Sequence, residues 1–173
     1  MFFELMAVIA LGFGAYGLAL LVRKITGGAL PRFFVPASAG LAMFAFAIWA
    51  EYSWFARTAG GLPPGIEIVT THSDRSAFRP WTHVAPMTTR FSAVDIEGAR
   101  RNAAAPDQLM VEVLLFERFR PIVRAPLLVD CVGRRRADIA DGTAFDTAGR
   151  VIDPQWSPTE ADDPLIAKAC DDT

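Results

Sequence analysis

The sequence predicts an α+β protein, in which an amino-terminal transmembrane helical hairpin precedes a small antiparallel-sheet domain with a carboxy-terminal helix. Three observations predict this class. Two long runs near the start carry no charge, strand-like alternation dominates the middle of the chain, and a helix-start signal lies close to its end. We therefore expect a hairpin over 1–56, a linker rich in glycine and proline over 57–65, and a folded domain over 66–173.

The two uncharged runs are Leu5–Val22 and Phe33–Ala50. Each has 18 residues, and a helix needs about 20 mostly apolar residues to cross the hydrocarbon core. We expect helices at about 4–23 and 33–55. A cleaved signal peptide fits less well, because no basic residue precedes the first run and a second apolar run follows. Core helices of a soluble protein would carry a polar face, which these runs lack.

The charges around the two runs predict an orientation. The loop between them holds Arg23, Lys24 and Arg32, whereas Glu4 and Glu51 flank the outer ends. Positively charged loops stay in the cytoplasm. We therefore expect a bacterial inner-membrane protein with both termini in the periplasm and with the lipid bilayer as one partner.

Aromatic residues support the same arrangement. Trp49, Tyr52 and Trp54 lie near the end of the second run, and Phe2 and Phe3 lie at the start of the first. Indole and phenol rings prefer the boundary between lipid and water. Trp49, Tyr52 and Trp54 are thus the expected interface anchors.

Small residues share one face of each expected helix. Small side chains let helix backbones approach closely in lipid. The face could pack the hairpin on itself, or it could dock another membrane-protein subunit. No ionisable residue lies in the middle of either run, which argues against an ion path. The residues are Ala10, Gly14, Gly17, Ser38, Ala42 and Ala45.

The middle of the chain alternates apolar and polar residues, as half-buried strands do. The last two strands, separated by a short turn, are expected to pair antiparallel. A polar, alanine-rich segment over 96–107 reads as a short surface helix or a loop. The expected strands are 66–72, one or two short strands over 81–96 broken near Pro86, 109–119 and 127–132.

A short terminal helix is expected to begin with Asp163 as N-cap and Pro164 in the first turn. Its apolar face includes Cys170, and the other cysteine, Cys131, falls on the inward face of the 127–132 strand. If both lie outside the cytoplasm, a Cys131–Cys170 disulfide is expected. An inverted topology would favour two separate buried thiols instead. Neither cysteine has a Cys or His at metal-ligand spacing.

A resemblance joins several of these residues. The order of a strand ending in Asp-Cys, a basic run, a Trp-Ser-Pro turn and a terminal helix with Cys resembles small periplasmic or surface domains related to bacterial surface-adhesin protein E. The resemblance covers roughly Ile66 to Cys170 and implies a small disulfide-closed α+β domain, not a chemistry. In this chain a membrane hairpin stands in place of a signal peptide or lipid-anchor cysteine. The matching residues are Asp130, Cys131, Arg134, Arg135, Arg136, Trp156, Ser157, Pro158 and Cys170.

No motif in the sequence indicates catalysis, a cofactor or a metal. His72, Ser73 and Asp74 are adjacent, but a hydrolytic triad is assembled in three dimensions, and neighbours on a strand point to different sides. His72 with His83 lacks a third ligand. From Arg57 onward the chain has 14 basic and 17 acidic residues, which gives no general attraction to nucleic acid.

Two groups of side chains remain as candidates for contact with a ligand or partner. Arg134–Arg136 could meet anionic headgroups or an acidic partner, although pairing with nearby acids would also explain them. Trp81, Phe91 and Trp156 would line a pocket if the chain binds a ligand. We expect a non-catalytic accessory or assembly component of an inner-membrane complex. A tethered ligand-binding or sensing module is the alternative.

Overall fold

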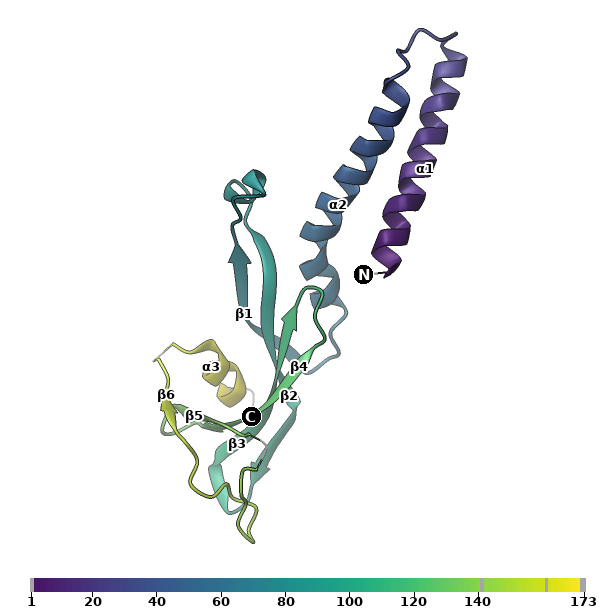
Figure 1. Cartoon of the computed structure of the whole chain (residues 1–173). Helices are drawn as coiled ribbons and strands as arrows, with labels where there is room; N and C mark the ends of the chain where they lie inside the picture. Colours follow the sequence, from purple (N-terminus) through teal and green to yellow (C-terminus); the bar gives the residue numbers. More distant parts are fainter. Residues whose placement is uncertain (1, 141, 161, 172–173) are drawn as a thin grey trace. The chain divides into compact units, whose positions relative to one another are not determined.

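The computed structural model describes residues 2–140, 142–160 and 162–171, and the chain divides into two compact units between Ala56 and Arg57 (Figure 1). Two long helices come first, followed by an antiparallel sheet and a terminal helix, which confirms the predicted α+β class. The elements are α1 (Phe2–Ile25), α2 (Phe34–Gly60), β1 (Ile66–Asp74), the 3₁₀ helix η1 (Pro80–His83), β2 (Met87–Asn102), β3 (Ala105–Glu117), β4 (Val123–Asp130), β5 (Arg135–Asp138), β6 (Ser157–Pro158) and α3 (Pro164–Asp171).

The first unit contains α1 and most of α2. Both helices are long and apolar enough to cross a membrane, and few of their residues are buried within the protein, which is compatible with a membrane anchor. The helices meet where Gly12 faces Met43: a Cβ at Gly12 would lie 2.7 Å from the Met43 sulfur. The second helix is longer than the expected 33–55. It continues to Gly60 and leaves only 61–65 as the connection to β1.

The second unit is built on one sheet. Its six strands follow in the order β1-β2-β3-β4-β5-β6, and each pairs antiparallel with the next along the chain. Loop 75–86 and turn 118–122 lie at one end of the sheet, because β1 ends opposite the start of β2 and Glu117 at the end of β3 lies opposite Arg90. The turns at 103–104 and 131–134 lie at the other end.

The expected helix or loop over 96–107 is wrong. Strand β2 continues to Asn102, and β3 begins at Ala105 after a two-residue turn in which the Ala104 amide donates to the Asn102 side chain over 2.8 Å. Alanine and arginine favour helices, but pairing with β3 overrides that preference. In this pairing Arg101 lies opposite Leu109. A register shift between Asp95 and Arg100 accommodates the change from the regular ladder.

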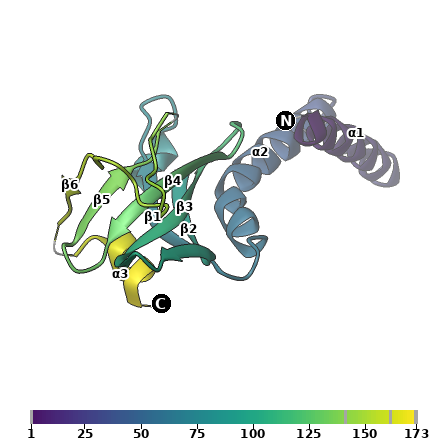
Figure 2. The ribbon, with the colours of Figure 1, turned by 90° about the horizontal axis from the view of Figure 1, so that it is seen from below.

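The core of this unit forms between one face of the sheet and α3. The predicted alternation is confirmed in β3, where Leu109, Val111 and Val113 are buried in the core. Helix α3 packs against β1 and β2 and contributes Ile166 and Ala169 to the same cluster (Figure 2). The opposite face is also buried in part, and there Phe91 stacks on Phe116 with 4.5 Å between ring centroids.

Burial should decide the effect of shortening leucines in β3. Leu109 is 1% exposed and Leu115 is 45% exposed, although both project from the same face of the strand. We predict that Leu109→Ala lowers the free energy of unfolding of the sheet domain by about 2–5 kcal/mol, because a buried leucine leaves a cavity. Leu115→Ala, the matched control, should change it by less than about 1 kcal/mol. Denaturant unfolding followed by tryptophan fluorescence measures both, and equal losses would contradict the assignment of the core.

Candidate functional site

The expected Cys131–Cys170 disulfide is present. The two sulfur atoms lie 2.06 Å apart and the two Cα atoms 5.8 Å apart, across a sequence separation of 39. Cys131 follows the last residue of β4, and Cys170 lies in the last turn of α3. Both are partly buried against the hydrophobic core. The bridge therefore joins the terminal helix covalently to the end of a central strand.

Polar contacts at the start of the same helix and in its last turn also hold it in place. Asp163 is the predicted N-cap, and its carboxylate accepts from the Leu165 amide over 2.9 Å. A carboxylate there also complements the helix dipole. The same side chain pairs with Arg136 of β5 over 3.4 Å, and Lys168 pairs with Glu67 of β1 over 2.6 Å. Helix α3 is thus held by two ion pairs as well as by the disulfide.

Asp130, the last residue of β4, makes the side-chain contacts that stabilise the 131–134 turn, where the arginine run begins. Its side chain is 8% exposed and accepts from the Gly133 amide over 2.8 Å and from the Arg135 guanidinium over 2.7 Å. Burial alone would raise the pKa of Asp130, but these two donors, together with the Val132 amide, outweigh it and lower the pKa. Arg135 in turn stacks over the Trp156 ring, with 4.5 Å from its central carbon to the ring centroid.

The arginine run therefore has internal partners. Arg135 is shared between Asp130 and Trp156, and Arg136 pairs with Asp163. Arg134 has a positive φ of 46°, and its carbonyl accepts from the Thr159 hydroxyl over 2.7 Å. Arg135 and Arg136 do pair with acids, although the partners are Asp130 and Asp163 and not the expected Asp138. The residues that carry the resemblance thus connect the 131–134 turn, the strand pair β5–β6 and helix α3.

The three aromatic residues considered as the lining of a ligand pocket, Trp81, Phe91 and Trp156, do not lie together. Trp81 lies in η1, within loop 75–86 at one end of the sheet, whereas Trp156 contacts Arg135 at the other end. Phe91 is fully buried against Phe116. The sequence shows aromatic residues but not the register of the sheet, and the register separates these three.

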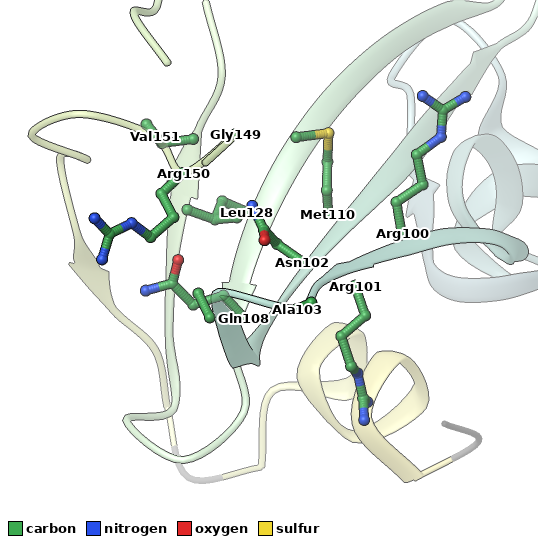
Figure 3. Close-up of a pocket in the computed structure, with 11 residues that line it drawn as sticks. Arg100, Arg101, Asn102, Ala103, Gln108, Met110, Leu128, Gly149, Arg150 and Val151 are labelled. Atoms are coloured by element: carbon green, nitrogen blue, oxygen red, sulfur yellow. The ribbon is translucent and has the colours of Figure 1, made fainter. Parts of the chain in front are cut away.

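A cavity of about 380 Å³ lies beside the turn between β2 and β3 (Figure 3). Met110 and Leu128 contribute apolar lining, and the loop that carries Arg150 closes it, where the Asn102 amide donates to the Ala148 carbonyl over 2.8 Å. The guanidinium groups of Arg100, Arg101 and Arg150 point in different directions (Figure 3). Arg150 pairs with Asp146 over 2.7 Å. The arginines thus do not converge on one anion.

The residues weighed as catalytic or metal-binding are not brought together. The Thr89 hydroxyl donates to Asp74, while His72 lies opposite Arg90 in the register of β1 and β2. The Ser73 hydroxyl lies 3.5 Å from that of Thr88, so His72, Ser73 and Asp74 each have a different neighbour on β2 and do not form a hydrolytic triad. Over residues 2–140, 142–160 and 162–171, no group of three His, Cys, Asp or Glu side chains could hold a metal ion.

The small residues of α1 do not face α2. A Cβ at Gly14 or Gly17 would meet no described atom within 4 Å beyond the backbone of its own helix, and Ala10 is exposed. The contact uses Gly12 and Ala19 instead, which are buried. Packing of the hairpin on itself therefore does not explain this face of α1. In α2, Ser38 and Ala42 are half-buried and Ala45 is exposed, and among the expected anchors Trp49 is exposed while Tyr52 and Trp54 are half-buried.

No protein-family model, curated protein or solved structure matches this chain. The resemblance to surface-adhesin protein E-like domains therefore stays a prediction.

The sequence did not predict the cavity or the group of contacts around Asp130. Asp130, Arg135 and Trp156 were recognised separately, and only the turn at 131–134 and the pairing of β5 with β6 bring them together. The aspartate-to-glycine spacing at Asp130 and Gly133 was the available signal, because an aspartate side chain often accepts from a backbone amide a few residues on.

Removing the disulfide should release α3. The bridge closes a loop of 39 residues, which is expected to contribute about 4 kcal/mol. We predict that Cys131→Ser and Cys170→Ser each lower the free energy of unfolding by a similar amount, and that the double variant loses little more. Limited proteolysis should cut first near α3 in all three variants. Additive losses in the single variants, or thiol labelling of unfolded protein without reductant, would contradict the bridge.

Replacing Asp130 should remove a pH-dependent contribution. The pKa of Asp130 is lower in the folded chain than in the unfolded one, so its stabilising effect is present above about pH 4 and is lost as the pH falls through the folded-state pKa. We predict that Asp130→Asn costs about 1–2 kcal/mol at pH 7. The difference from the unmodified protein should vanish at low pH in unfolding curves. The exposed Asp138→Asn is the control, and a pH-independent loss in Asp130→Asn would contradict this account.

Proposed function

We propose that this chain is a membrane-anchored periplasmic accessory or assembly component of a bacterial inner-membrane protein complex, without a catalytic role of its own. The helical hairpin would span the membrane, and both termini would lie in the periplasm. The basic residues of the loop between the helices support this orientation. The disulfide supports it independently, because such bonds persist outside the cytoplasm.

The observation that carries the proposal is the exposed face of α1. Among the residues that the structure describes, a side chain at Gly14 or Gly17 would begin with no atom within 4 Å except those of its own helix backbone, and Ala10 on the same face is exposed. In lipid, such a face allows the backbone of another helix to approach closely, where dispersion contacts stabilise the pair. The occupant we propose is a transmembrane helix of a partner protein.

The chemistry of the outer domain supports a binding role over an enzymatic one. Asp130, Arg135, Arg136, Asp163 and Lys168 are used in pairs that hold the fold. The alternative, a periplasmic ligand-binding or sensing module, depended on aromatic residues that lie at opposite ends of the sheet. Its remaining support is the cavity at the β2–β3 turn, whose arginines diverge (Figure 3).

Co-purification from native membranes in mild detergent tests the proposal. A leucine at Gly14 fits within this chain but would keep a partner helix away from the exposed face of α1. Gly14→Leu should therefore reduce the recovery of a stoichiometric partner by about tenfold or more. Gly40→Leu is the matched control, because a Cβ at Gly40 of α2 would also meet no atom of the described chain within 4 Å beyond its own helix backbone. Recovery of a chain without a stoichiometric partner, or equal loss with both variants, would contradict the proposed role.

A further inference from the structure

One end of the sheet combines exposed apolar side chains with an excess of positive charge. This sheet tip consists of residues 74–90, which include loop 75–86, and residues 115–124, which include turn 118–122. The two segments are neighbours, because the Arg118 amide donates to the Thr89 carbonyl over 3.2 Å. We propose that the sheet tip docks on the anionic headgroups of the membrane and inserts its apolar side chains into the interface. The inference rests on the proposed anchoring of the chain.

Several apolar side chains of the sheet tip are exposed. Phe78 is 95% exposed and Val84 is 90% exposed, both in loop 75–86. Binding to a membrane surface strengthens with the apolar area buried at the headgroup boundary and with the attraction to anionic lipids, and the sheet tip offers both. The other exposed members are Leu115, Phe119, Ile122 and Val123.

The charge of the sheet tip is opposite to that of the rest of its domain. The tip carries six arginines and two carboxylates, although acidic residues outnumber basic ones from Arg57 onward. Arginine buries its aliphatic stem beside apolar groups while its guanidinium binds phosphate oxygens. Each basic residue near an anionic surface contributes favourably. The arginines are Arg75, Arg79, Arg90, Arg118, Arg120 and Arg124.

Chain lengths allow the sheet tip to reach the membrane. Helix α2 has 27 residues, about 40 Å, against a hydrocarbon core of about 30 Å. Residues 61–65 add at most about 18 Å. Strand β1 has 9 residues and spans about 30 Å from this connection to the tip, so a strand that runs back toward the bilayer reaches its surface. The short connection also keeps the effective concentration of the tip at the membrane high.

Spin-label accessibility in nanodiscs tests the proposal on the full chain. Because Cys131 and Cys170 are bridged, a cysteine introduced at Val84 is the free thiol to label. In discs of phosphatidylcholine with 30% phosphatidylglycerol, a label at Val84→Cys should gain contact with oxygen and lose contact with a water-soluble nickel complex. A label at Ile152→Cys, an exposed position near the other end of the sheet, should stay accessible to nickel.

A matched pair of charge variants tests the headgroup contact. Among the described residues, Arg75, Arg90, Arg100 and Arg101 have no ion-pair partner, and all four are exposed. The double variant with Arg75→Glu and Arg90→Glu should lower the ratio of membrane-inserted to water-exposed Val84 label by about tenfold or more. The double variant with Arg100→Glu and Arg101→Glu, outside the tip, should leave this ratio unchanged. High salt should act like the first pair.

The outcomes separate this proposal from the anchoring that it assumes. Incorporation of the chain into discs with the Val84 label still in water would overturn the docking and leave the anchor intact. Equal effects of the two charge pairs would also overturn it. A chain that fails to enter discs would refute the anchor, and the same label would then be measured with anionic vesicles added from outside, where protection from nickel supports the sheet tip and its absence overturns it.

Discussion

The covalent bridge between Cys131 and Cys170 holds together the two parts of the sheet domain that form its core. Helix α3 has 8 residues, which is too short for a helix to be stable alone in water. Its buried side chains nevertheless complete the cluster that covers Val94, Leu109 and Val129. Without that helix, one face of the sheet would expose its core to water. The bridge therefore protects the sheet as much as it fixes the helix.

Charged groups near the bridge extend the same constraint. Asp130, next to Cys131, closes the 131–134 turn and orients Arg135 over Trp156, while Asp163 caps α3 and meets Arg136. Each group makes more than one contact, so the strand pair, the turn and the helix depend on one another. This shared use leaves the opposite end of the sheet, with the exposed Arg75 and Arg90 and its exposed apolar side chains, as the part suited to external contacts.

The sequence predicts much of this fold because its main signals are local. Uncharged runs, alternation in β3 and a cap at Asp163 each follow from neighbours along the chain. The disulfide was predictable because only two cysteines exist and both fall on inward faces. Segment 96–107 was misread because its pairing with β3 outweighs its helical composition.

Features that depend on strand register or on the rotation of a helix about its axis could not be predicted from these local signals. The separation of Trp81 from Trp156 follows from which strand ends meet. The face of α1 that meets α2 is set by the fit of Met43 against Gly12, not by the larger group of small residues around Gly14. The sheet tip combines loop 75–86 with turn 118–122, and the antiparallel order of the strands brings these distant segments to one end.

The central claim is that the disulfide-closed domain lies outside the cytoplasm. A reporter enzyme that is active only in the periplasm, fused after Thr173 in a bacterial host, tests it most directly. The same reporter enzyme inserted in the loop between α1 and α2 tests whether this loop lies in the cytoplasm. We predict an active reporter after Thr173 and an inactive one in the loop. A well-expressed but inactive fusion after Thr173, with activity in the loop fusion, would contradict it.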